Sequence, residues 1–244
     1  MSIADKLQTI AENEQRVYNA GILNGREKEY NSFWDMYQAN GSRTIYRYAF
    51  SEWDDAHYKP KYKVQPTYAE YMFRKSSIRN NAYTDMLDFS KCVNMRECFS
   101  ESKKLSKLKV IDCRATNLKN GGSNGMYRIF HNCYNLASID MFYPSKEFNF
   151  DDSFTNCTNL REIRVGSEIS VNGLDLSTST LLSKASIESI INSLSSTKSG
   201  LTVKFSKVAV QNAFGIPDIT DENSWTYEYK LLRNSKPNWS IGYI

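Results

Sequence analysis

The chain has 244 residues, of which 41% are hydrophobic and 24% charged, and these fractions are ordinary for a soluble protein. The formal net charge of +4 is too small and too dispersed to indicate nucleic-acid binding, and no apolar run is long enough to predict membrane insertion. The opening MSIADKLQTIAENEQRVYNAG lacks the basic and apolar regions of a signal peptide. We therefore expect a protein that stays in the cytoplasm or leaves it by assembly into a particle.

Residues 1–25 are expected to form an amphipathic N-terminal helix. Its apolar positions follow a 4-3-7 spacing and are Ile3, Leu7, Ile10 and Val17. Two interpretations remain open, because a heptad pattern this short is marginal on its own. The helix either packs on its own domain or joins protomers in a short parallel bundle. In the second case these four residues are the oligomerisation residues of a homo-oligomer.

Residues 26–84 are expected to form an aromatic-rich N-terminal cap. Within residues 30–73 there are 13 aromatic side chains, and basic residues are interleaved in HYKPKYK. Aromatic rings with polar neighbours suit sugars, and tyrosine-rich surfaces suit protein contacts. The alternative is that most of the rings form the core of the cap. The candidate binding residues, expected to be exposed, are Trp34, Trp53, Tyr58 and Tyr62.

Residues 85–170 contain a repeat. Phe99, Phe130 and Phe154 each lie four residues after a Met or Phe and three residues before a Cys or Ser. A Leu, a Leu or Ile, and a Val or Met follow at the same intervals in each copy. The copies are 31 and then 24 residues apart, because CRATNLKNGGSNG lengthens one connection. Such self-similarity predicts stacked units that share one interior.

Each copy is expected to contain a short helical turn followed by a short strand. We call the repeating pattern the frame and its recurring phenylalanine the frame phenylalanine. The apolar positions just before this phenylalanine have the i, i+3, i+4 spacing of a helix. The apolar positions near the end of each copy alternate with polar ones, as in a strand. Stacking would then place Phe99, Phe130 and Phe154 in register. Cys133 and Cys157 fall on the apolar stripe, so we expect them to pack as small buried side chains. Leu87 and Phe89 look like an earlier strand, which places the first coil near residue 85.

Residues 171–244 are expected to continue the repeat irregularly and to form a C-terminal cap. Ser183 is a plausible N-cap for a helix with Ile187, Ile190, Ile191 and Leu194 on one face. Leu201–Phe205 alternates as a strand, and a short helix around Val210 ends at Gly215. SWTYEYKLL and the segment from Trp239 to Tyr243 also alternate, which predicts two further strands.

No motif predicts an enzyme. The chain has no phosphate-binding loop or zinc-protease motif, and its loose glycines do not form a dinucleotide fingerprint. The doublets Asp54-Asp55 and Asp151-Asp152 could supply paired carboxylates for glycoside cleavage, but such doublets in polar turns are usually solvated. Five cysteines without a CxxC pair, and only two histidines, predict neither a disulfide framework nor a metal site. We therefore expect no catalytic residue, metal or cofactor.

The repeat resembles the cysteine-bearing leucine-rich repeats of the BspA-like kind, most closely in VNMRECF and GMYRIF. These repeats are common in bacterial surface proteins and in structural proteins of phages of Gram-positive hosts. The opening of the chain also resembles tail-region proteins of such phages. The implied fold is α/β: a short leucine-rich-repeat solenoid of three to five coils of helical turn plus strand, with an N-terminal helix and α+β caps.

The resemblance implies a non-enzymatic virion protein at the tail or another exterior position. Its partners would be other virion proteins, further copies of itself, and a host surface protein or glycan bound through the solenoid. The alternative is a bacterial leucine-rich-repeat module that binds a protein or glycan outside any virion. Neither interpretation involves nucleic acid or membrane insertion.

Overall fold

The computed structural model of the chain describes residues 65–78, 85, 87–116 and 125–244. Within these residues, helices accompany parallel strands that form two three-stranded sheets, ordered β1-β2-β3 and β4-β5-β6. The elements are η2 (Phe89–Lys91), β1 (Lys107–Asp112), β2 (Ser138–Tyr143), β3 (Glu162–Val165), β4 (Leu174–Leu176), α6 (Lys184–Ser193), β5 (Leu201–Phe205), α7 (Lys207–Phe214), η3 (Glu222–Ser224), α8 (Tyr227–Asn234) and β6 (Trp239–Tyr243).

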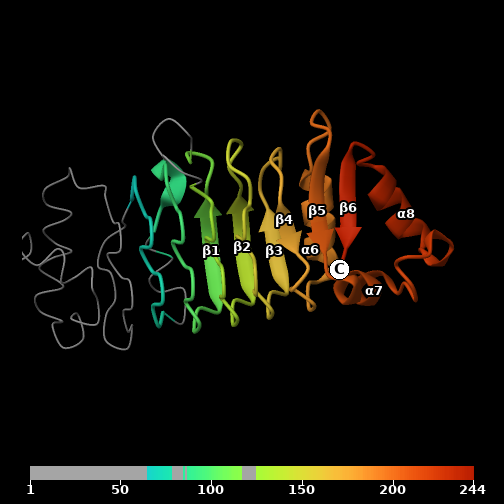
Figure 1. Ribbon diagram of the computed structural model, residues 1–244, viewed down its shortest axis with the longest axis horizontal. Helices are drawn as coiled ribbons and strands as arrows, with labels where there is room; N and C mark the ends of the chain where they lie inside the picture. The colour runs from blue at the N-terminus through green and yellow to red at the C-terminus, as the bar shows by residue number, and fades with distance from the viewer. Residues whose placement is uncertain (1–64, 79–84, 86, 117–124) are drawn as a thin grey trace, which may run out of the picture.

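The first sheet is formed by the strands that follow Phe99, Phe130 and Phe154. Figure 1 shows β1, β2 and β3 side by side along the long axis of the molecule. Leu108 pairs with Ile139, which pairs with Ile163, and all three side chains are buried. The expected alternation is wrong beyond this position, because Ile111 and Phe142 are the next buried side chains and Val110 is 43% exposed. We call the outer side of this sheet the strand face.

The segments around the frame phenylalanines form the opposite wall. We call residues 69–76, 95–102, 126–133 and 150–157 the turn segments. Alternate backbone N–H groups bond to the next segment, as from Phe73 to the Cys98 carbonyl at 2.7 Å and from Phe99 to the Ile129 carbonyl at 2.9 Å. The N–H groups between them close tight turns, as from Cys98 to the Met95 carbonyl at 3.0 Å.

The expected helical turn is wrong in its backbone. Residues with positive φ occur twice in every turn segment, at Tyr71 and Lys75, Glu97 and Glu101, Arg128 and Asn132, and Asp152 and Asn156. A left-handed residue interrupts a right-handed helix. An i, i+3, i+4 apolar stripe is therefore compatible with a run of β-turns as well as with a helix. The β-turns leave alternate N–H groups free to bond along the stack.

The frame phenylalanines form a continuous row in the interior. Ring centroids are 5.4 Å apart for Phe73 and Phe99, 5.9 Å for Phe99 and Phe130, and 5.1 Å for Phe130 and Phe154. The last three rings pile in register, as the repeat predicts. Phe73 adds an earlier member, which sequence reasoning missed because it grouped that residue with the aromatic-rich cap.

The Cys/Ser position of the frame has a bonding role as well as a packing role. The Oγ of Ser102 donates to the Phe73 carbonyl at 2.5 Å, and the Sγ of Cys133 donates to the Phe99 carbonyl at 3.0 Å. Cys157 repeats the contact with the Phe130 carbonyl at 3.2 Å. All five cysteines are buried and none forms a disulfide. Each of these contacts ties a copy to the copy before it.

Helix α6 occupies the place beside β3 where another strand would lie. Ser183 caps it as predicted, because its hydroxyl accepts from the Ser186 N–H. Two α6 hydroxyls accept from the edge of β3: Ser186 from the Ile163 N–H and Ser189 from the Val165 N–H, both at 2.9 Å. The helix thus satisfies backbone donors that would otherwise be left on an open sheet edge.

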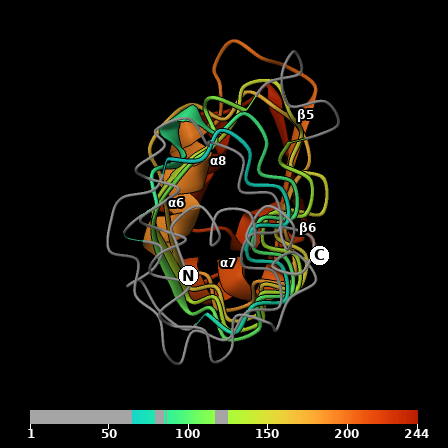
Figure 2. The same ribbon diagram turned by 90° about the vertical axis from the view of Figure 1, so that its left-hand side faces the viewer.

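The second sheet continues the wall of turn segments, not the first sheet. The Phe150 N–H bonds to the Asn172 carbonyl, two residues before β4 begins. Figure 2 shows α6 on one wall of the molecule and β5 and β6 on the other. The predictions of strand β5, of helix α7 with its left-handed C-cap at Gly215, and of strand β6 are confirmed.

Two predicted strands are wrong. SWTYEYKLL contains α8: the Thr226 hydroxyl caps it by accepting from the Tyr229 N–H, and Tyr229 alone in the helix is fully buried. Tyr229 packs against Phe214 with a centroid distance of 4.8 Å, whereas Tyr227, which a strand would place on the same side, is 77% exposed. Phe89 lies in the 3-10 helix η2, where Asp88 caps the chain before a strand can form.

Candidate interaction surface

None of the residues predicted to bind or to oligomerise falls in the described part of the chain. They are Trp34, Trp53, Tyr58, Tyr62, Ile3, Leu7, Ile10 and Val17. Two other surfaces can be described, one on the wall of turn segments and one on the strand face.

The turn-face row consists of side chains on the outer side of successive turn segments. Its members are Tyr71, Arg74, Arg96, Glu97, Glu101, Tyr127, Arg128 and Asp152. Most of its members have a positive φ or directly adjoin a residue that does, and four of them lie two residues before Phe73, Phe99, Phe130 or Phe154. Sequence reasoning missed the row, although aligning the copies places Tyr71, Glu97, Arg128 and Asp152 at one position.

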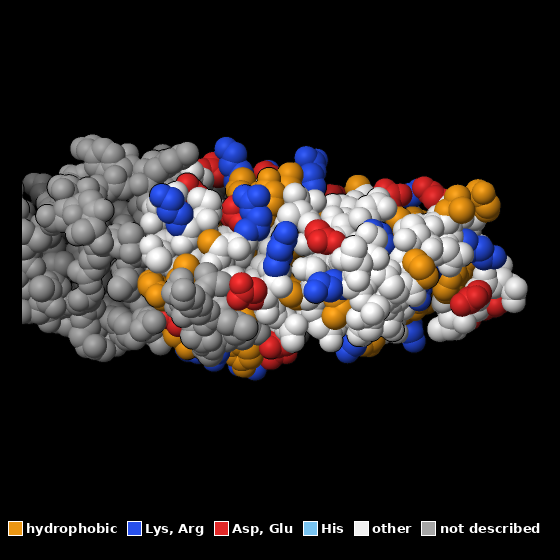
Figure 3. Space-filling view, turned by 90° about the horizontal axis from the view of Figure 1, so that it is seen from above, with side chains coloured by type: hydrophobic (Ala, Val, Ile, Leu, Met, Phe, Trp, Pro, Cys, Tyr) orange, Lys and Arg blue, Asp and Glu red, His pale blue; other side chains and the backbone are white. Residues whose placement is uncertain are grey.

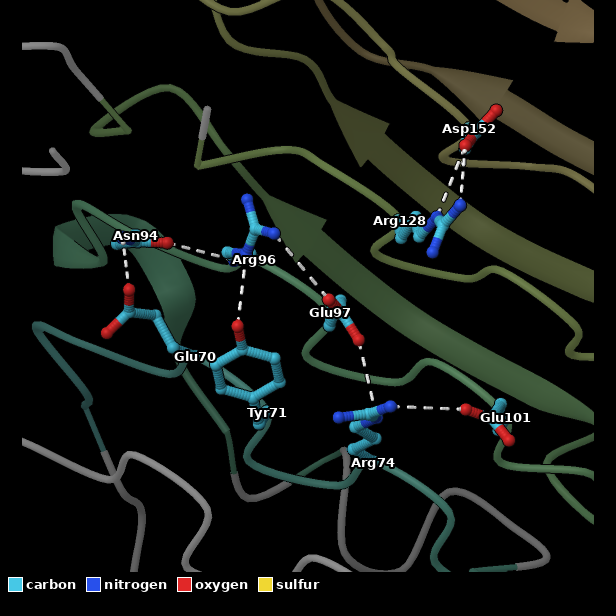
Figure 4. Close-up of polar contacts among 9 residues, drawn as sticks. All are labelled: Glu70, Tyr71, Arg74, Asn94, Arg96, Glu97, Glu101, Arg128 and Asp152. Atoms are coloured by element: carbon cyan, nitrogen blue, oxygen red, sulfur yellow. Dashed lines mark hydrogen bonds and ion pairs between the residues drawn. The ribbon is translucent and has the colours of Figure 1, made fainter. Parts of the chain in front are cut away.

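Most contacts in the turn-face row join one copy to the next. Arg74 reaches Glu97 at 3.3 Å and Glu101 at 3.5 Å, and Arg128 reaches Asp152 at 3.1 Å, as Figure 4 shows. Such partly exposed ion pairs contribute only about 0–1 kcal/mol each. Their effect is to orient the side chains.

Aromatic rings of the row are covered by guanidinium groups. Arg96 lies over the Tyr127 ring at 4.3 Å and donates to the Tyr71 hydroxyl at 3.1 Å. Arg128 also approaches the Tyr127 ring, at 4.8 Å. Below them, the buried Asn94 amide donates to Glu70 at 2.7 Å and accepts from the Arg96 N–H. The arginine and tyrosine side chains of the row are thus held by one another and by Asn94 from inside the stack.

Charges of both signs are mixed over the described surface. Figure 3 shows lysine and arginine side chains interspersed with aspartate and glutamate on the face it presents. Asp151 and Asp152 are both exposed, and Asp152 is paired with Arg128. The doublet therefore lies in a solvated turn on the outer side of the stack.

The buried thiols are poorly suited to nucleophilic catalysis or metal binding. Burial raises the pKa of Cys92 and Cys157 to about 12, and raises the pKa of Cys98, Cys113 and Cys133 well above the ordinary value of 9.0. A thiol in this state is a poor nucleophile and a poor metal ligand. Within the described residues, no three His, Cys, Asp or Glu side chains lie close enough together to hold a metal ion.

A groove opens on the strand face between β3 and α6. Its volume is about 480 Å³, and its lining includes Asp140, Glu162 and Arg164 from the strands and Ala185 and Ser189 from α6. Small side chains on α6 leave the space open, because a larger residue at position 185 would project into it. No pattern in the sequence marked this groove, which exists because a helix replaces a strand.

Comparison of the chain with models of protein families, with curated proteins and with solved structures finds no match. Among the helices in the described ranges, none is long and apolar enough to cross a membrane.

Proposed function

We propose that the chain is a non-enzymatic structural protein of a phage particle, carried at the tail or another exterior position, where a leucine-rich-repeat solenoid adheres to the host surface. The stacked copies support the solenoid: parallel strands on one wall, turn segments on the other, and a row of phenylalanine rings between them. The resemblance of the repeat to BspA-like repeats supports the phage setting.

The turn-face row is the observation that carries the adhesion proposal. A solenoid offers an extended surface whose side chains repeat at fixed spacing, and such surfaces serve binding. Arginine and tyrosine, which dominate this row, are enriched where proteins bind one another. The contacts of Arg74 and Arg128 across neighbouring copies hold the side chains in place before a partner arrives, which lowers the entropic cost of binding.

The N-terminal residues, which lie outside the described part of the chain, complete the proposal. Ile3, Leu7, Ile10 and Val17 would join protomers, and Trp34, Trp53, Tyr58 and Tyr62 would extend the binding surface. The first part is tested by fusing residues 1–25 to a monomeric carrier and measuring the mass of the product. A strictly monomeric fusion removes the oligomerisation segment from the proposal.

The adhesion proposal is tested with the labelled full-length chain on intact Gram-positive cells. Replacing Arg96 and Arg128 by alanine should weaken cell binding by at least about tenfold, since each removes a planar hydrogen-bond donor from the row. Lys198→Ala, at an exposed position far along the chain, is the matched control. Unchanged binding by the double variant would exclude the turn-face row.

The virion location needs a separate measurement. Particles released from a strain that carries the gene should contain the chain when purified and analysed by mass spectrometry. Cell binding without any chain in the particles would favour the bacterial interaction module instead.

A further inference from the structure

The groove between β3 and α6 has a floor and two walls of different chemistry. Ile163 forms part of the floor, the carboxylates of Asp140 and Glu162 and the guanidinium of Arg164 line one side, and Ala185 and Ser189 line the other. The volume of about 480 Å³ lies within the range of small-molecule sites.

The polar groups of the groove are positioned by neighbours outside it. Glu162 accepts hydrogen bonds at one carboxylate oxygen, Oε2, from Ser183 at 2.9 Å and Ser186 at 3.3 Å. Asp140 is paired with Lys107 at 3.1 Å. Arg164 is exposed and makes no ion pair within the described residues. The site thus offers fixed acceptors on two carboxylates and a guanidinium donor.

The lining of the groove carries two formal negative charges, on Asp140 and Glu162, and one positive charge, on Arg164. Lys107 lies outside the lining and pairs with Asp140 at 3.1 Å. An anionic ligand would meet two carboxylates at close range, and a cation would meet the guanidinium. A neutral ligand with many hydroxyl groups satisfies both kinds of group, because its O–H groups donate to carboxylates and its oxygens accept from arginine.

A peptide strand fits the groove poorly. Adding a strand to β3 requires its free N–H groups, but those of Ile163 and Val165 are already bonded to Ser186 and Ser189. The occupied N–H groups therefore favour a small hydroxylated ligand over a polypeptide strand.

We propose that this groove binds a neutral saccharide of one or two sugar rings, with Asp140, Glu162 and Arg164 bonding to its hydroxyl groups. The inference rests on the proposed adhesion function and narrows it to a glycan of the host surface. It also moves part of the recognition from the turn-face row to the strand face.

The test is a titration of the isotope-labelled full-length chain, followed by amide NMR shifts. The probes are N-acetylglucosamine, glucose, galactose and the disaccharides chitobiose and maltose. The inference predicts that at least one probe shifts the amide signals of Arg164, Ala185 and Ser189 together. Arg164→Ala should weaken that binding by at least about tenfold, and Ala185→Trp should abolish it by filling the groove. Arg161→Ala is the control, because Arg161 is exposed on the same strand end but does not line the groove.

The outcomes separate this inference from the function on which it rests. If no probe shifts the three signals, or if Arg164→Ala and Ala185→Trp bind as tightly as the unaltered chain, the saccharide site is wrong. Cell binding measured on the same preparations then shows whether adhesion survives without it. Saccharide binding in the groove, with no binding to cells, would instead uphold the site and contradict the adhesion proposal.

Discussion

The Sγ of Cys133 donates a hydrogen bond to the carbonyl oxygen of Phe99, 3.0 Å away in the preceding copy of the repeat. Ser102 makes the same contact through its hydroxyl to the Phe73 carbonyl. The frame therefore selects a small side chain that can donate, and either sulfur or oxygen serves.

This relationship predicts different results for two substitutions of Cys133. Cys133→Ser keeps a donor where Ser102 already uses one, so it should change the free energy of unfolding by less than about 1 kcal/mol. Cys133→Ala removes the donor and leaves a small cavity, and it should destabilise by about 1–2 kcal/mol. Urea unfolding monitored by fluorescence measures both. A serine variant less stable than the alanine variant would show that the position selects for packing alone.

Phe130 is an inner member of the row of phenylalanine rings. It contacts both Phe99 and Phe154, and it is fully buried. Phe130→Ala should lower the free energy of unfolding by about 3–5 kcal/mol, because a cavity opens in the middle of the row. Val208→Ala, at a side chain that is 50% exposed, should stay within about 0.5 kcal/mol of the unaltered chain. Equal effects of the two substitutions would contradict a shared interior.

Buried thiols make the stability fall at alkaline pH. The pKa of Cys157 is about 12 in the folded chain against the ordinary 9.0, so the unfolded chain releases this proton first as the pH rises. The contribution of this thiol is complete below about pH 9 and is lost between about pH 9 and 12, by about 1.4 kcal/mol per pH unit. Cys157→Ser should reduce the measured slope by that amount. Identical slopes for both proteins would mean that Cys157 ionises as readily folded as unfolded.

The serines of α6 that bond to β3 should contribute more to the free energy of unfolding than their helix propensity suggests. Ser189→Ala removes the acceptor of the Val165 N–H and should cost about 1 kcal/mol, with faster hydrogen exchange at that amide. Alanine is the better helix former, so Asn192→Ala, at an exposed site of the same helix, should be neutral or stabilising. Stabilisation by both substitutions would show that α6 does not close the sheet edge.

The repeat could be predicted because burial imposes a spacing on the sequence. Phe99, Phe130 and Phe154 recur because one interior must be filled at every copy. Helix α6 could be predicted because its apolar residues share one face and Ser183 precedes them as an N-cap. The backbone of the turn segments could not be predicted, because an apolar stripe does not distinguish a helix from β-turns with left-handed residues such as Glu97. That distinction depends on N–H groups that bond to a neighbouring copy.

The error at α8 has a different origin. Trp225, Tyr227 and Tyr229 alternate as a strand would, but Tyr227 is 77% exposed and only the contacts of Tyr229 decide the conformation. Thr226 as N-cap and Arg233 in the last turn were the signals of a helix. The groove left no signal, because Glu162 and Ala185 come together only when a helix takes the place of a strand.

The stacking itself is tested most directly by nuclear Overhauser effects between phenylalanine rings in the full-length chain with isotope-labelled phenylalanine. We expect cross-peaks from Phe73 to Phe99, from Phe99 to Phe130 and from Phe130 to Phe154, and none from Phe73 to Phe154. Rings without this nearest-neighbour order would contradict the shared interior on which the proposed solenoid depends.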